Sequence, residues 1–429
     1  MKNQGYCNII QIVNDIHSNH EWIYKPRFLA ASLQEAVGDH PVIVLLGARQ
    51  AGKSTLLSEE TPFRGWRYVS LDDFDALAQA ERDPVALWAG AERVVIDEVQ
   101  KSPALLPAVK QAVDHSRRRF RFVLSGSSSL VLMQNVTESL AGRAVSFTLQ
   151  PMCTGEELGR KPSRILDDLM NGRFPKERGV DPLKKPVEDL FVRGFLPPLL
   201  DLSGVDAAVR WWEGYVATYL ERDLRALSQV SSLADFRRVM EALALRSGQV
   251  LNQTTVSREV GISQPSVHRY VNLLETTTVL LRLPAYTKSR TKRLVKSPKV
   301  YFLDPGLAAF LAGHHDPGGL SRSREIGAMF ETLALLHLRI GTQRMLPRPK
   351  LFYWRTVSGR EVDFVVESGK KLLALEAKLT TKPRYSDAEG LRDFMKAHPN
   401  TNAGILVHNG PSIRRLDEKI AAIPWWLIA

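Results

Sequence analysis

The sequence has little cysteine and no long apolar run. Its 429 residues contain two cysteines, Cys7 and Cys153, so a disulfide framework is excluded and no pair has zinc-ligand spacing. No stretch approaches the roughly 18 consecutive apolar residues that span a membrane. Gln11, Asn14 and Asp15 interrupt the N-terminal stretch, where a signal peptide is continuously apolar. We therefore expect a cytoplasmic protein in a reducing compartment, with no membrane partner.

Acidic residues are missing from one basic segment. The composition is that of an ordinary globular protein, and the length predicts about two to four domains. The net charge is +12, yet residues 1–150 carry 16 basic and 16 acidic side chains, so the excess lies beyond them. The run KSRTKRLVKSPK contains no carboxylate and six positive side chains, namely Lys288, Arg290, Lys292, Arg293, Lys296 and Lys299. This density suits the phosphate backbone of DNA, and a solvated basic loop is the alternative.

A glycine-rich motif follows an apolar run near the N-terminus. Residues 42–57 read VIVLLGARQAGKSTLL, which places G-x-x-x-x-G-K-S between a strand and a helix. This P-loop pattern predicts a nucleoside triphosphate ligand, taken as ATP, although no feature distinguishes ATP from GTP. The predicted phosphate-binding residues are Gly47, Ala48, Arg49, Gln50, Ala51, Gly52, Lys53, Ser54 and Thr55. Lys53 neutralises phosphate charge and Ser54 binds magnesium; an accidental glycine-rich turn is the alternative.

Four further apolar runs follow at the rhythm of alternating strands and helices. They are Trp66–Leu71, Val94–Ile96, Phe120–Leu124 and Val145–Leu149. This rhythm predicts a mainly parallel sheet with helices on both faces. One strand ends in Asp97 and Glu98, where the Asp can hold magnesium and the Glu can polarise the attacking water. A plain strand end is the alternative.

Two polar residues near the next strands are weaker candidates. Ser125 ends a strand, where it can sense the γ-phosphate, although Ser-Gly is also an ordinary turn. Arg143 directly precedes the last strand of this sheet, and in oligomeric ATPases an arginine here can reach the nucleotide of the neighbouring subunit. A surface salt bridge is the alternative for Arg143.

Taken together, the motifs GARQAGKS, YVSLDD, IDEVQ, LSGSS and SLAGR resemble the AAA-type P-loop ATPases of bacteria and archaea that carry a C-terminal domain of formerly unknown function. The resemblance extends nearly to the C-terminus. It implies nucleotide roles for Gly47, Gly52, Lys53, Ser54, Asp97 and Glu98. Asp72 and Asp73 also match, without an assigned chemical role.

The middle of the chain is predicted to be helical. Residues 151–234 are interpreted as a helical lid, with an amphipathic helix over Trp211–Leu227. Residues 235–312 have helix-turn-helix spacing, and two strand-like runs flanking the basic segment predict a winged helix. Its second helix presents Ser263, Gln264, Ser266, His268 and Arg269 outward, whereas Val267, Val271 and Leu274 pack inward. Winged helices bind DNA or dock proteins, and both remain open.

The C-terminal residues 320–429 contain an acidic constellation. Glu331 lies on a predicted helix, Asp363 near the start of a strand, and Glu376 and Lys378 share one face of the next strand. Two carboxylates beside a lysine can bind magnesium and orient hydroxide against a phosphodiester. The arrangement resembles the restriction-endonuclease-like nuclease fold, although Val362 replaces the proline of that motif. A degenerate domain that only holds DNA is the alternative.

The sequence therefore predicts an α/β protein with four parts. These are a P-loop AAA-type core with a parallel sheet (1–150), a helical lid (151–234), a winged helix (235–312) and a nuclease-like α/β domain (320–429). The favoured function is ATP hydrolysis with magnesium, in a homo-oligomer, coupled to DNA binding or remodelling. The alternatives are a nucleotide-dependent switch or scaffold with an inert tail, and an ATP-regulated metal-dependent nuclease.

Overall fold

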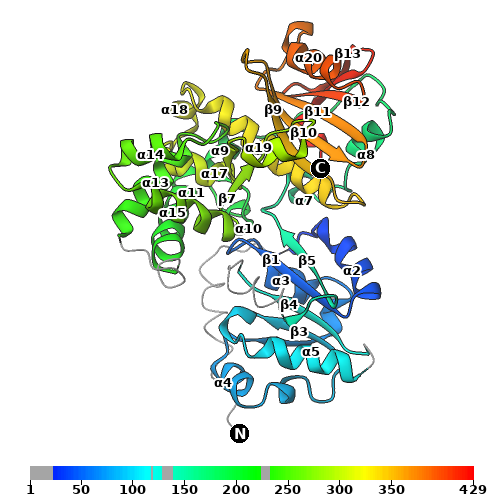
Figure 1. Ribbon diagram of the computed structural model, residues 1–429, viewed down its shortest axis with the longest axis vertical. Coiled ribbons are helices and arrows are strands. Elements are labelled where there is room, and N and C mark those ends of the chain that lie inside the picture. The colour runs from blue at the N-terminus through cyan, green and yellow to red at the C-terminus, as the bar shows by residue number, and fades with distance from the viewer. Residues whose placement is uncertain (1–22, 117–118, 128–138, 224–231) are drawn as a thin grey trace.

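The computed structural model describes residues 23–116, 119–127, 139–223 and 232–429, without the side chains of 220–223. Cys7, Ser128 and the end of the predicted helix at Leu224–Leu227 lie outside them. The described chain forms a five-stranded, a seven-stranded and a two-stranded sheet. Figure 1 places the first at one end of the molecule, the second at the other, and a helical region beside the junction. No helix of the described residues is long and apolar enough to cross a membrane.

The N-terminal domain is built on the five-stranded parallel sheet. Its strands are β1 (Val42–Gly47), β2 (Arg67–Ser70), β3 (Arg93–Asp97), β4 (Arg121–Ser125) and β5 (Ala144–Leu149). The order is β2-β3-β4-β1-β5, so the first strand lies inside the sheet and its carboxyl end is flanked by β4 and β5. All neighbouring strands are parallel. The predicted parallel sheet is confirmed.

Helices cover both faces of this sheet because its strands are apolar on both sides. The helices are α2 (Leu29–Asp39), α3 (Lys53–Glu59), α4 (Phe74–Arg82) and α5 (Leu105–His115). Ile43 and Leu45 join the core that contains buried residues of α2 and α3. Val44 and Leu46 alternate with them and join the core that contains α5. Asp73 caps α4 by accepting a hydrogen bond from Ala76, which gives this residue a structural role.

The chain leaves the ATPase sheet through a segment that contacts the C-terminal sheet. It forms α7 (Thr154–Glu157), α8 (Ile165–Met170) and β6 (Arg178–Gly179). The α8 helix packs against two C-terminal strands, and β6 extends the C-terminal sheet by pairing with β13 (Ser412–Asp417). The first part of the segment interpreted as a lid is thus attached to the C-terminal domain.

A helical region follows. It contains α9 (Val187–Arg193), α10 (Pro197–Leu200), α11 (Val205–Tyr215) and the π-helical stretch η4 (Val216–Asp223). The sequence predicts one helix from Trp211 onward, but the α-helical pattern changes to π at Val216. Trp212 and Tyr215 are buried, as the amphipathic spacing predicts.

Three helices and an antiparallel strand pair come next. They are α13 (Leu233–Ala244), α14 (Gln253–Val260), α15 (Gln264–Thr276), β7 (Leu280–Leu283) and β8 (Lys299–Phe302). Gly261 takes a left-handed conformation (φ 73°) that ends α14, and Ser263 caps α15. Val267, Val271 and Leu274 are buried, as predicted. A short helix, α16 (Arg290–Val295), occupies the basic segment between the strands.

The C-terminal domain is a mixed sheet flanked by helices. Its strands β9 (Lys350–Arg355), β10 (Glu361–Ser368), β11 (Lys371–Lys378), β12 (Thr401–His408) and β14 (Ile420–Pro424) join β13 and β6 in the order β6-β13-β14-β12-β11-β10-β9. Helices α19 (Ile326–Gln343) and α20 (Glu389–Ala397) pack against this sheet, whereas α17 (Pro305–Leu311) and α18 (Pro317–Ser321) precede it and pack against α9 of the helical region. The three consecutive strands β9 to β11 are antiparallel, and the predicted α/β class is confirmed. Short 3-10 turns lie at Phe63–Gly65, Pro84–Trp88, Val99–Lys101, Tyr385–Ala388 and Trp425–Leu427.

Candidate functional sites

The P-loop connects the carboxyl end of β1 to the first turn of α3. Gly47 is required by packing, because a Cβ there would lie 2.6 Å from the carbonyl oxygen of Leu149. Gly52 has φ 89° and precedes the helix in a left-handed conformation, which glycine adopts without strain. Gln50 is also left-handed (φ 64°) although it carries a side chain. The loop therefore exposes backbone N–H groups in a compact turn.

Lys53 lies inside this loop. Its side chain is buried, and its ammonium donates hydrogen bonds to the carbonyls of Gly47 and Ala48, both at 3.1 Å. Burial lowers the pKa of Lys53, while the nearby carboxylates of Glu98 and Asp97 oppose the shift. These contacts are with neutral carbonyls, so Lys53 can exchange them for phosphate oxygens.

Asp97, at the end of β3, accepts hydrogen bonds from hydroxyl groups of one helix and two strands. Ser54 Oγ donates to it at 2.6 Å and the Tyr68 hydroxyl at 2.5 Å, both to Oδ2. Ser125 donates to Oδ1, which also accepts the backbone N–H of Glu98 at 3.0 Å. Burial alone raises the pKa of Asp97, but these hydrogen bonds outweigh it, and the pKa lies below its ordinary value. Asp97 is therefore ionised at neutral pH.

Glu98 follows in a left-handed conformation (φ 56°), which is uncommon for a residue with a side chain and is frequent at functional sites. Gln100 donates a hydrogen bond to Glu98 Oε2 and another to Ser127 Oγ at 3.1 Å. Burial raises the pKa of Glu98, which makes this carboxylate a stronger base than an exposed glutamate.

The arrangement fits a magnesium nucleotide. The Ser54 hydroxyl and the Asp97 carboxylate share a 2.6 Å hydrogen bond, so both oxygens face one point. Hard oxygen donors of this kind suit magnesium. A cavity of about 400 Å³ opens beside the loop at Gly52 and Thr55, with walls that include Tyr24, Pro197 and Trp211.

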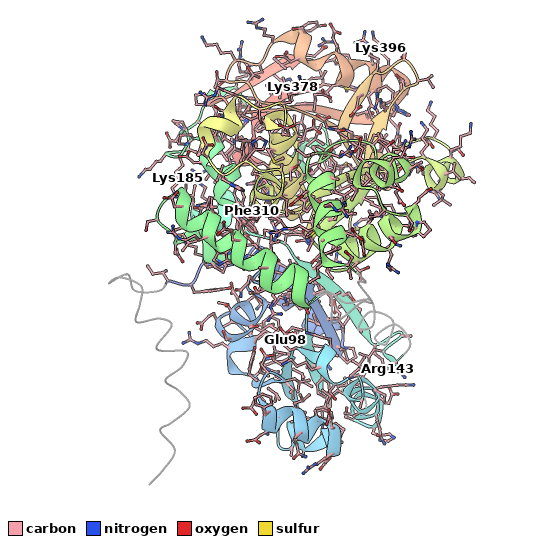
Figure 2. The ribbon with its side chains drawn as sticks, turned by 90° about the vertical axis from the view of Figure 1, so that its left-hand side faces the viewer. Glu98, Arg143, Lys185, Phe310, Lys378 and Lys396 are labelled. Carbon is pink, nitrogen blue, oxygen red and sulfur yellow. The ribbon has the colours of Figure 1, made fainter. Side chains whose placement is uncertain are left out.

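Arg143 lies at the end of the sheet opposite to the P-loop. Its neighbour Ala144 pairs with Val42 at the start of β1, whereas Gly47 pairs with Leu149. Five strand residues separate these positions, which is about 17 Å at ~3.3 Å per residue. Figure 2 labels Arg143 and Glu98 apart from each other in the ATPase domain. Arg143 forms a bidentate pair with Asp114 at 2.6 and 2.8 Å, so it does not act on the nucleotide of its own chain.

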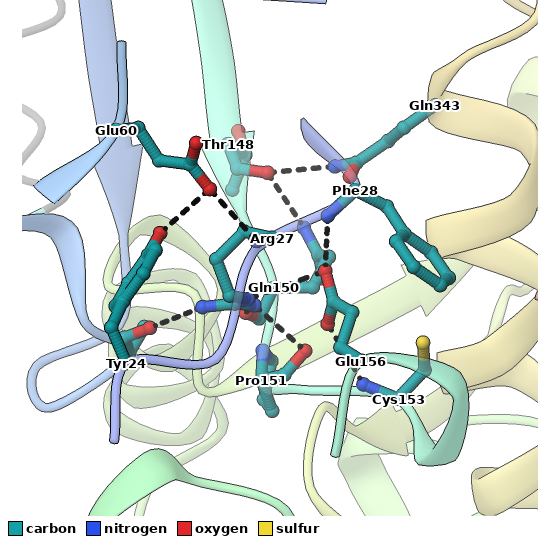
Figure 3. Close-up of polar contacts among 11 residues, drawn as sticks. Tyr24, Arg27, Phe28, Glu60, Thr148, Gln150, Pro151, Cys153, Glu156 and Gln343 are labelled. Carbon is teal, nitrogen blue, oxygen red and sulfur yellow. Dashed lines mark hydrogen bonds and ion pairs between the residues drawn. The ribbon is translucent and has the colours of Figure 1, made fainter. Parts of the chain in front are cut away.

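Arg27 joins the P-loop to the segment after β5. Its buried guanidinium donates to the carbonyls of Ala51 at 2.8 Å and Gln150 at 2.7 Å (Figure 3). Glu156 Oε1 lies 3.2 Å from Arg27 Nε and balances its charge. Arg339 of α19 donates to the Gln150 side chain at 3.1 Å. A chain of polar contacts thus connects the P-loop with the helix that carries Glu331.

The four residues of the predicted nuclease-like site come from neighbouring elements. Glu331 lies on α19, Asp363 on β10, and Glu376 and Lys378 on β11. The Lys378 ammonium lies 2.9 Å from Glu376, and Asp363 accepts the backbone N–H of Ala377 at 2.9 Å. Burial and the Asp363 charge raise the pKa of Glu331 and of Glu376 to about 8. Burial also raises the pKa of Asp363.

The magnesium site predicted at these carboxylates stays a prediction, and the carboxylates are not arranged around a metal position in this structure. In the part of the chain that the structure describes, no group of three or more His, Cys, Asp or Glu side chains is arranged to hold a metal ion. The charge of Lys299 lies among them instead, 3.6 Å from Asp363 and 3.7 Å from Glu331, with Glu361 as a third partner. The residues do not fit the metal in this arrangement.

The DNA contacts predicted for the basic segment also stay a prediction, but Lys299 and Arg293 already have acidic partners within the chain. Lys299 is buried and Arg293 is paired with Glu367 at 2.8 and 3.0 Å, while it stacks on Tyr286 and Phe352. These two cations do not face solvent phosphates. The exposed members are Lys288, Arg290, Lys292 and Lys296.

Several site residues were not predicted from the sequence. Tyr68 and Gln100 hold the two carboxylates of the nucleotide site, Arg27 holds the P-loop, and Glu361 pairs with Lys299. Glu361 could have been found, since it lies two residues before Asp363 on one strand and so shares its face. The contacts of Tyr68 and Arg27 cross between elements and leave no local sequence signal.

Three family models match parts of the chain. Residues 39–158 match the AAA domain, residues 184–317 match a domain of unknown function (DUF8612), and residues 326–428 match another (DUF4143). Two solved structures also align. One is a Signal Transduction ATPase with Numerous Domains (STAND) protein with a tetratricopeptide repeat sensor from Pyrococcus horikoshii, 11% identical, covering 77% of this chain and 48% of that chain with a TM-score of 0.25. The other is protein VC1899 from Vibrio cholerae, 12% identical, covering 90% and 95% with a TM-score of 0.19. At these scores neither alignment supports an argument about this fold.

Two protein sequences are more similar to this chain than these two structures are. The uncharacterized proteins Rv2008c of Mycobacterium tuberculosis and Mb2031c of Mycobacterium bovis are each 31% identical over 408 residues, which is 94% of this chain and 84% of the relative. The agreement spans all three matched domains. The chain therefore belongs to the family of these two mycobacterial proteins, with an N-terminal AAA domain of the P-loop ATPase class and a C-terminal DUF4143 domain.

Proposed function

We propose that the protein binds ATP with magnesium at the P-loop and hydrolyses it. The observation that carries this proposal is the Asp97 geometry. One carboxylate accepts hydrogen bonds from the P-loop Ser54 and from Ser125 of the neighbouring strand, directly beside a half-buried, left-handed Glu98. Magnesium, when bound, would neutralise charge on the terminal phosphates.

Each residue has a distinct task in this reaction. Lys53 replaces its two carbonyl partners with phosphate oxygens, and Ser54 and Asp97 provide the oxygen ligands for the metal. Glu98 accepts a proton from the attacking water as its oxygen bonds to the γ-phosphorus and the bond to the β-phosphate oxygen breaks. Gln100 orients Glu98 through its hydrogen bond. The products are ADP and inorganic phosphate.

Lys53→Ala tests the binding step. We expect binding of a fluorescent ATP analogue to weaken by more than tenfold, because the buried cation is lost. The matched control is Lys110→Ala, which removes an exposed lysine of α5 in the same domain. Equal nucleotide affinity in Lys53→Ala and wild type would contradict the assignment of Lys53 to phosphate binding.

A DNA-directed role is a second candidate, favoured by the four exposed cations Lys288, Arg290, Lys292 and Lys296. They lie on or beside α16, between the strands of a β-pair that follows three helices, which is compatible with a winged helix. Assembly into a homo-oligomer would let Arg143 exchange Asp114 for the nucleotide of a neighbouring subunit. A nucleotide-dependent switch that docks a protein is the competing role. Retention of duplex DNA at low salt, lost steeply as salt rises, separates the two.

A further inference from the structure

Lys299 is the first residue of β8, yet it contributes its charge to another domain. Its side chain is 3% exposed. Its ammonium faces Glu331 of α19 at 3.7 Å and Asp363 of β10 at 3.6 Å, and it forms a close ion pair with Glu361. All three carboxylates belong to the C-terminal domain. Lys299 is thus surrounded by acidic groups supplied by two other elements.

A second residue of β8 reinforces this contact. Tyr301 is two positions along the strand and therefore on the same face as Lys299. Its hydroxyl lies 3.1 Å from Glu331 Oε2. From the loop after α13, Gly248 approaches so closely that a Cβ there would lie 3.0 Å from the same oxygen. The helix and strand unit of residues 233–302 therefore closes over one side of the carboxylates.

Glu376 adds a further carboxylate near Asp363 and Lys299. Glu376 is 8% exposed, and its Oε2 is buried without a hydrogen-bond partner. Its other oxygen pairs with Lys378 at 2.9 Å. Magnesium requires oxygen ligands at about 2.1 Å in a near-octahedral set, whereas the oxygens of Glu331, Glu361 and Asp363 are spread around the Lys299 ammonium.

We propose that the Lys299 ammonium is the resident cation of the cluster formed by Glu331, Glu361, Asp363 and Glu376, and that it closes this cluster to divalent metal ions. Removal of Lys299 opens a metal site in the same place. The C-terminal domain thus holds an internal amine where the resemblance to nucleases implies a metal. The inference is independent of ATP hydrolysis.

The test is Mn²⁺ binding in the absence of nucleotide. Binding is measured by isothermal titration calorimetry and by the loss of the electron paramagnetic resonance signal of free Mn²⁺. The variant Lys299→Met keeps the length of the side chain without its charge. Lys296→Met, an exposed lysine three residues earlier, is the matched control. We expect Lys299→Met to bind one Mn²⁺ at least tenfold more tightly than wild type or the control, and Mn²⁺ to raise its melting temperature.

The added site must depend on the carboxylates. Asp363→Asn in the Lys299→Met background is expected to remove it. Lys299→Gln, which keeps a polar group in the buried position, repeats the experiment should the methionine variant fail to fold. The proposal is overturned when wild type itself binds an Mn²⁺ ion that Asp363→Asn abolishes, or when a folded Lys299→Met or Lys299→Gln gains no site.

Discussion

The P-loop and the C-terminal cluster each place a buried lysine beside carboxylates, with opposite consequences. Lys53 is held by the carbonyls of Gly47 and Ala48, while Asp97 is satisfied by hydroxyl groups. Lys299 is held by three carboxylates. A lysine bound by neutral groups can be transferred to phosphate at little electrostatic cost, whereas one bound by several charges cannot leave without exposing them. The partners of each lysine therefore decide which site is open to an ionic ligand.

The largest expected effect is at the open site. Asp97→Asn removes the ionised ligand and should lower ATP turnover by about 100-fold or more, because metal and phosphate positioning are both lost. The magnesium dependence of nucleotide binding should flatten as well. The measurement is phosphate release over a magnesium titration, with the exposed Asp75→Asn of α4 as the matched control. Wild-type ATP turnover in Asp97→Asn would contradict the role of Asp97 as a metal ligand.

The next effect is on stability at the closed site. At about pH 9, where Glu331 is ionised, Lys299→Met leaves Glu331, Glu361 and Asp363 without their buried counter-charge, which should cost about 3 kcal/mol of unfolding free energy. Urea denaturation monitored by tryptophan fluorescence measures it, beside the exposed Lys296→Met. If both variants unfold at the same urea concentration, the charge of Lys299 does not hold the cluster together.

A smaller effect is a pH dependence. Burial and Asp363 raise the pKa of Glu331 and Glu376 to about 8 in the folded chain. The folded chain then binds more protons than the unfolded chain between about pH 5 and pH 8, so this contribution to stability falls as the pH rises through that window. Glu376→Gln should make the fall of the unfolding free energy with pH less steep, by up to about 1.4 kcal/mol per pH unit.

Urea denaturation at several pH values gives that slope. Glu389→Gln, an exposed glutamate at the start of α20, is the control. The difference between variant and wild type isolates the contribution of Glu376 from those of all other titratable groups. An unchanged slope in Glu376→Gln would show that this residue carries no extra proton.

The smallest effect concerns the exposed part of the basic segment. Lys292→Ala should weaken duplex DNA binding by about threefold and lower the slope of log affinity against log salt by about 1, as expected for one phosphate contact. Lys185→Ala, an exposed lysine of the helical region labelled in Figure 2, should leave both unchanged. Equal losses in both variants would indicate a diffuse charge effect.

The nucleotide site was largely predictable because its signals are local. The P-loop, Asp97 and Glu98 each lie directly after a buried strand, and parallel strands bring their carboxyl ends to one edge. Tyr68 and Gln100 were not predicted. The contact of Tyr68 with Asp97 depends on the register between β2 and β3, and the contact of Gln100 with Glu98 depends on the short 3-10 turn that follows Glu98.

The C-terminal domain shows where the sequence is insufficient. Strands β9 to β11 follow from alternation, and Glu376 and Lys378 were placed on one face correctly. The basic segment looked uniform, yet Lys299 differs from Lys296 because its partners lie more than 30 residues away on α19 and β10. The pairing of the two-residue strand β6 with β13 is likewise a long-range contact with no periodicity to detect.

The most direct test of the account is phosphate release from saturating ATP and magnesium by wild type and Glu98→Gln. The account predicts that wild type turns over ATP at least about 100-fold faster, while Glu98→Gln still binds the nucleotide, because only the proton acceptor is lost. Equal turnover by the two proteins, or no phosphate release by wild type, would contradict it.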